Sequence, residues 1–213
     1  MTRCKDCDIK LKGDVFPLCL QCRKKRALAA LAPDKVLPAE VPRVIIENIS
    51  KEYDPECAFK SSTFIHGEQG TGKSHLAAKI MYAEMMNATP TNFNQFAWIN
   101  VSLLLFNIRQ SYNSPEQAQD ERFLVEKYSS IPWLCFDDLG VEKTSEWALQ
   151  TMYLIINQRY ENIRTTIITS NFDLDELADK LGDDRITSRI RGMCKIIKLS
   201  GADRRTHKDR RGK

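Results

Sequence analysis

The sequence predicts an α/β fold in which a parallel sheet flanked by helices carries a phosphate-binding loop. Three observations support this prediction. A glycine-rich loop lies between a short apolar run and a helical segment, and a later apolar run ends in two adjacent carboxylates. Apolar runs also alternate with helical patterns along most of the chain, without internal repeats. Strands that alternate with helices imply a parallel sheet with right-handed connections.

Composition limits the classes of protein to consider. A chain of 213 residues suits one sizeable domain and a small appendage. Its 32 basic and 28 acidic residues give a net charge of +4, too small to indicate nucleic-acid binding. Basic runs at residues 23–26 and 204–213 together favour contact with phosphate backbones, although each alone is typical of a solvated surface. Without a membrane-length apolar run or a secretory segment, we expect a cytoplasmic protein with reduced or metal-bound cysteines.

Two cysteine pairs occupy the first segment of the chain. Cys4 and Cys7 form one C-x-x-C pair and Cys19 and Cys22 the other. Two such pairs can hold one Zn²⁺ tetrahedrally, and the metal replaces the core that so short a segment lacks. The alternative, a redox pair, lacks the βαβ context in which such motifs usually lie. We therefore predict a structural zinc site in residues 1–26.

A helix and a linker should follow the cysteines. Residues 23–32 are basic and rich in alanine and leucine, which favours a helix. Three prolines, Pro33, Pro38 and Pro42, then break the chain into an extended linker. This segment is the predicted boundary between two domains.

The phosphate-binding loop has the spacing Gly-x-x-x-x-Gly-Lys-Ser between a predicted strand at residues 62–66 and a helix at 75–86. In that context backbone N–H groups and the helix N-terminus can surround a polyphosphate. Lys73 would reach the β- and γ-phosphates and the Ser74 hydroxyl would bind Mg²⁺. The bare pattern also fits a simple glycine-rich turn. The expected nucleotide-binding residues are Gly67, Glu68, Gln69, Gly70, Thr71, Gly72, Lys73, Ser74 and His75.

A second polar cluster ends the apolar run at residues 133–138. A short apolar segment at 96–100 and helices at 102–112 and 116–128 precede it. Buried parallel strands read as continuous apolar runs, and ligands bind at their carboxyl ends. Asp137 would hold Mg²⁺ through its water shell, and Asp138 would orient or deprotonate the attacking water. The alternative interpretation is a turn.

The remaining elements also end at marked residues. We predict a helix at residues 145–162, a strand at 165–170 that ends at Asn171, and a final strand at 195–199. Asp173 and Glu176 have the spacing of a capping box. The helix that they begin should stop at Gly182.

Several ordered motifs resemble those of the DnaC-type AAA+ ATPases, which include replicative-helicase loaders and the IstB-like ATPases of transposons. The resemblance covers about residues 43–205 and implies a P-loop AAA+ (ASCE) domain without a C-terminal lid. A four-cysteine domain ahead of the ATPase is similar to the arrangement in DnaI-type loaders, where that domain engages the helicase. The motifs are Gly70-Thr71-Gly72-Lys73-Ser74-His75-Leu76-Ala77, Phe136-Asp137-Asp138-Leu139-Gly140, Ile156-Asn157-Gln158-Arg159-Tyr160, Ile168-Thr169-Ser170-Asn171 and Ser188-Arg189-Ile190.

The resemblance also implies residue roles. Lys73 and Ser74 match Walker A, Asp137 and Asp138 match Walker B, and Asn171 matches sensor 1. Arg189 matches the arginine finger, which acts on ATP held by the neighbouring subunit, so activity would require oligomerisation. Arg205 best matches sensor 2, with Arg204 as the competing alignment. The segment at 102–114 resembles an initiator-specific element, in which Arg109 and Tyr112 are candidate contacts to single-stranded DNA, although packing explains Tyr112 equally well.

Taken together, these patterns lead us to expect an ATPase that loads a replicative hexameric (DnaB-like) helicase onto single-stranded DNA and is encoded by a phage or mobile element. The expected cofactors are ATP, Mg²⁺ and Zn²⁺, and the expected partners are the helicase, single-stranded DNA and further copies of the chain. The alternatives are a transposition-helper ATPase and a non-hydrolysing adaptor. Cys57, Cys135 and Cys194 are expected to pack in the interior. The expected domains are a zinc-binding domain at 1–26, a helix and linker at 27–42, an ATPase domain at 43–205 and a basic tail at 206–213.

Overall fold

The computed structural model describes residues 38, 41–43, 45–46, 61–87, 95–110, 118–141 and 145–203. Its centre is a five-stranded sheet in the order β2-β3-β4-β1-β5. Every neighbouring pair of strands is parallel, as the sequence predicts. The strands are β1 (Thr63–His66), β2 (Phe96–Asn100), β3 (Trp133–Leu139), β4 (Thr165–Ser170) and β5 (Lys195–Lys198).

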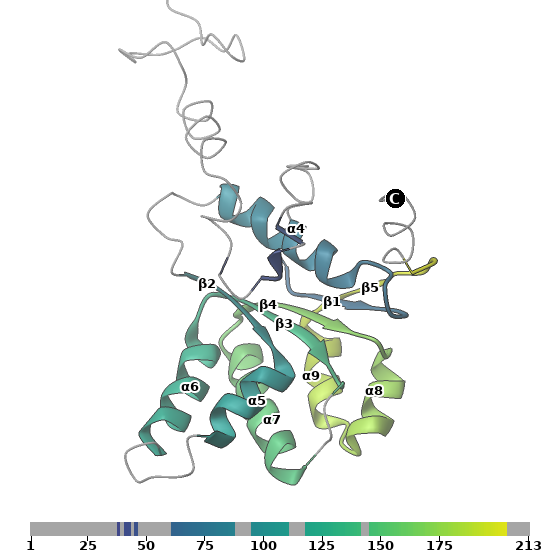
Figure 1. Ribbon diagram of the computed structural model, residues 1–213. Helices are drawn as coiled ribbons and strands as arrows, with labels where there is room; N and C mark the ends of the chain where they lie inside the picture. Colours follow the sequence, from purple (N-terminus) through teal and green to yellow (C-terminus); the bar gives the residue numbers. More distant parts are fainter. Residues whose placement is uncertain are drawn as a thin grey trace, which may run out of the picture.

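Helices cover both faces of this sheet (Figure 1). Helix α4 lies on one face, and α5, α6, α7, α8 and α9 lie on the other. Strands β1 to β4 are largely buried, as expected for parallel strands covered by helices, whereas the edge strand β5 is mostly exposed. The helices are α4 (Lys73–Asn87), α5 (Val101–Gln110), α6 (Ala118–Ser130), α7 (Glu146–Glu161), α8 (Leu174–Leu181) and α9 (Arg185–Met193).

The two faces of the sheet build two separate core clusters. Phe64 of β1 is buried among side chains of α5 and α7, whereas its neighbour Ile65 is buried against α4. This alternation follows from the two-residue repeat of a strand. Val41 and Ile45 also belong to the α4 cluster, so this described segment ahead of β1 contributes to that core.

Helix ends follow local chemistry closely. Asp173 accepts the N–H groups of Asp175 and Glu176, and the Glu176 side chain accepts the Asp173 N–H, which completes the predicted capping box. Gly182 ends α8 in the left-handed conformation with φ of 66°. Ser145 caps α7 by accepting from Ala148 N–H. The structure therefore confirms these predicted helix boundaries.

Other predicted boundaries shift by a few residues. Helix α4 begins two residues before the predicted start, so Lys73 and Ser74 belong to its first turn. Helix α6 runs from Ala118 to Ser130, so both of its ends lie two residues later than predicted. Helix α9 lies where the sequence suggested no element, and it is held by the buried side chains of Ile186 and Ile190.

Several predictions lie outside the described residues. They are the zinc site at Cys4, Cys7, Cys19 and Cys22, the helix at 23–32, Cys57, Tyr112, and Arg204 and Arg205 of the tail. In the part of the chain that the structure describes, no helix combines the length and apolar character needed to cross a membrane.

Candidate functional site

The glycine-rich loop between β1 and α4 depends on backbone conformations that favour glycine. Gly67, Gly70 and Gly72 have φ angles of 144°, 75° and 97°. A Cβ atom at Gly67 would overlap the carbonyl oxygen of Leu199, and one at Gly70 would overlap the carboxylate of Asp203. Gly67 is therefore required by both its backbone angle and the close backbone of Leu199, whereas Gly70 is required by its backbone angle.

Lys73 is folded into the curve of this loop. Its side chain is buried, and its ammonium group donates to the carbonyl oxygens of Gly67 at 2.8 Å and Glu68 at 2.7 Å. The Thr71 hydroxyl also donates to the Glu68 carbonyl, at 2.8 Å. The loop therefore surrounds a positive charge, beside the positive end of α4. This arrangement suits a polyphosphate.

The Ser74 hydroxyl joins the loop to β3. It donates a 2.8 Å hydrogen bond to Oδ1 of Asp137, 63 positions later in the sequence. The same carboxylate oxygen accepts a 2.7 Å hydrogen bond from the hydroxyl of Thr169 in β4. Three neighbouring elements thus meet at one carboxylate. Serine and aspartate oxygens are hard ligands of the kind that Mg²⁺ prefers, so this pair fits the predicted metal.

Burial sets the electrostatics of this junction. Asp137 is only 5% exposed, and burial raises the pKa of its carboxyl group, while the hydrogen bonds from Thr169 and Ser74 partly oppose that change. The nearby Lys73 ammonium also favours the ionised form. Cys135, two residues earlier, is fully buried, and burial with the two carboxylates raises the pKa of its thiol. That thiol stays protonated and serves packing.

Asp138 has an unusual backbone conformation. Its φ of 62° lies in the left-handed region, and the pairing of β3 with β4 shifts register between Phe136 and Leu139. Its N–H donates to the Thr169 hydroxyl at 2.9 Å, and its carboxylate lies 3.5 Å from the amide nitrogen of Asn100. A non-glycine residue in this region stores strain of about 1–3 kcal/mol. Strain of this kind gathers at functional sites, where the surrounding structure enforces it.

Three residues of this arrangement were missed in the sequence. Thr169 and Asn100 contact the two carboxylates, and Asp203 lies against Gly70. Asn100 could have been found, because it is the polar end of an apolar strand. Thr169 is two positions before Asn171 and therefore on the same side of the strand, which was also a usable signal. Asp203 offered none, since its position depends on how the chain continues after β5.

The remaining predicted residues are not all brought together. Asn171 follows β4 at the same sheet edge, half-buried, without a side-chain hydrogen bond among the described residues. Glu68 and Gln69 are exposed and His75 is half-buried. Arg189 lies on α9, where its polar contacts are with α7 and not with its own phosphate loop. The Arg109 guanidinium lies 5.9 Å from the Trp147 ring.

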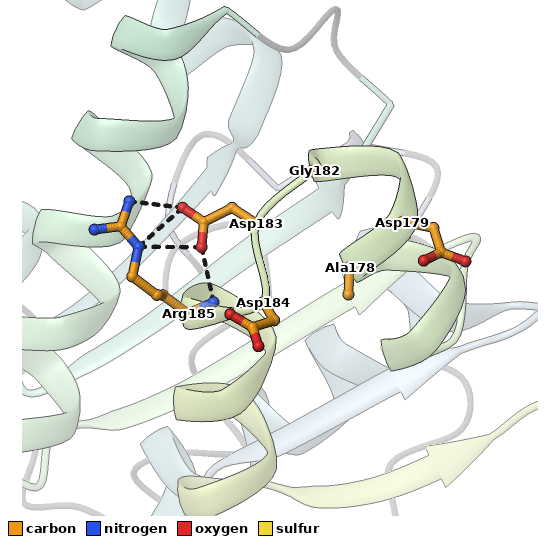
Figure 2. Close-up of a pocket in the computed structure, with 6 residues that line it drawn as sticks. All are labelled: Ala178, Asp179, Gly182, Asp183, Asp184 and Arg185. Carbon is orange, nitrogen blue, oxygen red and sulfur yellow. Dashed lines mark hydrogen bonds and ion pairs between the residues drawn. The ribbon is translucent and has the colours of Figure 1, made fainter.

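A separate pocket at the turn between α8 and α9 does not suit a polyphosphate (Figure 2). It is bordered by the carboxylates of Asp179, Asp183 and Asp184, of which Asp183 is paired with Arg185. The unpaired negative charge would repel an anion. No cluster of three potential metal-ligating His, Cys, Asp or Glu residues occurs in the described ranges. The phosphate loop with Asp137 therefore remains the candidate site.

Comparison with known proteins identifies relatives of the whole central region. The model of the family described as IstB-like ATP binding protein matches residues 58–212. A protein of Buchnera aphidicola subsp. Baizongia pistaciae (strain Bp), named replicative helicase loader DnaC, is 29% identical over 143 residues, or 67% of this chain and 55% of the relative. This chain thus spans about half the length of the curated relatives it matches.

Solved structures resemble the chain over most of its length. The crystal structure of the DnaC helicase loader gives a TM-score of 0.55 at 26% identity, covering 84% of this chain and 99% of that one. The crystal structure of DnaI gives a TM-score of 0.53, also at 26% identity, with 82% and 94% covered.

Proposed function

The chain belongs to the family of IstB-like ATP binding proteins, and from this premise we propose that it is a Mg²⁺-dependent ATPase that loads a replicative hexameric helicase onto single-stranded DNA. One observation carries the ATPase part: the Ser74 hydroxyl and the Asp137 carboxylate lie 2.8 Å apart beside a phosphate loop. A hydroxyl and a carboxylate at that place are the two protein groups needed near the metal of a nucleoside triphosphate.

Different groups of the site would bind the phosphates and the metal. The loop N–H groups and the α4 N-terminus would hold the phosphates, and the Lys73 ammonium would exchange its carbonyl partners for phosphate oxygens. Ser74 and Asp137 would release their mutual hydrogen bond to hold Mg²⁺. Bound Mg²⁺ would supply neutralisation of the charge that develops on the phosphates.

Turnover would use residues around this centre. Asp138, held by Thr169 and Asn100, would orient the attacking water, and Asn171 at the same sheet edge would contact the phosphate end. Arg189 of a neighbouring protomer would complete the pocket, and Arg205 would act from the same chain. Hydrolysis would then depend on assembly of several copies. This dependence would couple turnover to the partner on which the copies assemble.

Partner recognition is proposed from the relatives. Proteins named replicative helicase loader DnaC share this ATPase region, which favours a DnaB-like helicase as the partner. We propose that Cys4, Cys7, Cys19 and Cys22 bind Zn²⁺ and that the segment at residues 1–26 binds the helicase. Arg109, exposed near the end of α5, is the proposed contact to single-stranded DNA. The place of action would be the cytoplasm.

The proposal is tested with the Lys73→Ala variant of the full chain. Without the ammonium we expect no binding of a fluorescent ATP analogue and no loading of the host's replicative helicase onto single-stranded circular DNA. The intact chain should bind the analogue and transfer the helicase. An Arg164→Ala variant, changed at an exposed site away from the loop, is the matched control. Intact protein that neither binds ATP nor copurifies with the helicase would contradict the proposal.

A second candidate is a transposition-helper ATPase, because the family that the motifs resemble also includes the IstB-like ATPases of transposons. Its ATP site would use the same residues, so the partner separates the two candidates. Copurification from the native host with a transposase, and not with a helicase, would favour transposition over helicase loading as the function.

A further inference from the structure

We propose that Tyr153, Asn157 and Tyr160 of α7 form a cradle that aims the Arg189 guanidinium outward, toward ATP held by a neighbouring protomer. The three side chains are positioning residues, because they act on the phosphate only through Arg189. The inference rests on the proposed function, in which Arg189 acts between protomers.

Arg189 contacts three side chains of α7. Its Nε donates a 3.0 Å hydrogen bond to Oδ1 of Asn157, and its Nη2 lies 3.5 Å from the Tyr153 hydroxyl. Its guanidinium carbon lies 5.9 Å from the ring centre of Tyr153 and 5.7 Å from that of Tyr160. Two rings and one amide therefore hold the guanidinium through its Nε and Nη2 groups. The Nη1 group has no hydrogen-bond partner among the described residues, and the side chain is half-buried.

The cradle is built into the packing of α7 against α9. Tyr153, Asn157 and Tyr160 are spaced four and three residues apart, so they share one face of α7. Gly192 allows close approach, since a Cβ atom there would lie 3.2 Å from Cε2 of Tyr160. A larger residue would require this ring to shift. The backbone of α9 is thus held where the rings can reach the guanidinium.

Charge distinguishes Arg189 from the arginine one turn earlier. Arg185 also stacks on Tyr153, at 4.7 Å, but Asp183 neutralises it through an ion pair of 2.7 Å (Figure 2). Arg189 forms no ion pair within the described part of the chain. Its acceptor is a neutral amide, which fixes orientation without cancelling the charge. The amide Nδ2 of Asn157 donates in turn to Glu161 at 2.8 Å, which fixes the amide orientation.

This arrangement suits one chemical task. A guanidinium that stabilises a transferred phosphoryl group must keep its full charge and its free donors, and must be oriented before the reaction. A simple surface charge needs neither two aromatic rings nor an oriented amide. The contacts therefore hold the Arg189 guanidinium in a fixed orientation on α7, and no acidic side chain among the described residues pairs with its charge.

The test uses mixed protomers with single-stranded poly-dT and the helicase present. Lys73→Ala protomers retain Arg189 but hold no ATP, and Arg189→Ala protomers hold ATP but lack the guanidinium. Each should be inactive alone, and the mixture should recover ATP turnover. Placing Asn157→Ala on the Lys73→Ala protomers should lower the recovered turnover about tenfold, because small misplacements of a catalytic group are costly.

Controls separate positioning from folding. Gln158→Ala changes an exposed neighbour on α7 that makes no side-chain hydrogen bond among the described residues, and on the Lys73→Ala protomers it should leave the recovered turnover intact. The Arg189→Ala/Asn157→Ala double variant should bind ATP with the same affinity as Arg189→Ala, which would show that the loss of Asn157 leaves the fold and the ATP site intact. On the Lys73→Ala protomers, Tyr160→Phe keeps the ring. The mixture with this variant should therefore recover more turnover than the mixture with Tyr160→Leu.

The outcomes distinguish this inference from the proposed function. A mixture that recovers turnover equally well with and without Asn157→Ala overturns the cradle and leaves the shared ATP site standing. A mixture that recovers nothing, although the intact protein is active, overturns the shared site and the cradle with it. A loss of turnover that follows Asn157→Ala only on the protomer supplying Arg189 supports both.

Discussion

The Thr169 hydroxyl donates a 2.7 Å hydrogen bond to Oδ1 of Asp137 and accepts the backbone N–H of Asp138 at 2.9 Å. One side chain of β4 thus holds both residues of the carboxylate pair on β3. The hydroxyl is fully buried, so water cannot replace it in either bond. This relationship makes Thr169 a supporting residue of the candidate site.

Replacing Thr169 with valine should weaken the site without changing its shape. Valine has nearly the same volume but leaves the Asp138 N–H unpaired, which should lower the free energy of unfolding by about 1–3 kcal/mol. Turnover and apparent Mg²⁺ affinity should fall about tenfold, as is usual when a partner of a metal ligand is lost. Steady-state ATPase assays and urea unfolding measure both effects. Thr169→Ser keeps the hydroxyl and is the matched control; equal losses in both variants would contradict this role.

Asp137 should make the stability of the metal-free protein depend on pH. Burial raises the pKa of its carboxyl group above the ordinary value of 3.8, so the folded state binds that proton more tightly than the unfolded state. This tighter proton binding adds to the free energy of unfolding at low pH. The added stability is lost as pH rises from 3.8 through the raised pKa.

Asp137→Asn, which does not titrate, should consequently gain stability relative to the intact protein as pH rises across that interval. Urea unfolding of both proteins with EDTA, from about pH 4 to about pH 8, measures this difference in free energy of unfolding. A difference that stays constant with pH would show that Asp137 titrates normally in the folded state.

Arg159 should be a critical contributor to stability, far from the site. It is fully buried, and its guanidinium donates to the Thr166 hydroxyl and to backbone carbonyls of Tyr128, Ile131 and Thr165 at 2.6–2.9 Å. Burial lowers its pKa to about 9, so it stays charged at neutral pH. The side chain therefore ties the end of α6 and the start of β3 to α7 and β4.

Lysine cannot reproduce this planar set of donors. Arg159→Lys should lower the free energy of unfolding by about 3 kcal/mol, because buried carbonyls lose charged partners. Chemical denaturation measures the change, with Arg164→Lys, at an exposed position nearby, as the control expected to lie within about 0.5 kcal/mol of the intact protein. A small effect at Arg159 would mean that water satisfies those carbonyls.

Asp203 should oppose nucleotide binding. Its carboxylate lies against Gly70, where a negative charge repels an incoming triphosphate. Even in a high dielectric, two unit charges about 4 Å apart interact by about 1 kcal/mol, so Asp203→Asn should tighten ATP binding about fivefold. Titration with a fluorescent ATP analogue measures the affinity. Asp179→Asn on α8 is the control, and unchanged affinity in Asp203→Asn would place that carboxylate outside the field of the phosphates.

The sequence by itself determined the features that depend on neighbouring residues. The loop from Gly67 to Ser74, the strands, and the α8 boundaries set by Asp173 and Gly182 all follow from short-range spacing. Each depends on backbone angles, side-chain periodicity or caps within one or two turns of chain. The parallel arrangement also followed, because strands that alternate with helices have few other ways to pair.

Only the tertiary structure decided which distant groups touch. The order β3-β4-β1 places Thr169 of β4 beside the carboxylate pair of β3, and the register shift between β3 and β4 coincides with the left-handed conformation of Asp138. Packing of α9 on α7 likewise selects Asn157 as the acceptor for Arg189. Such contacts join residues 31 or more positions apart. Strand order, register and helix packing are set by burial of the whole core, so no local pattern specifies them.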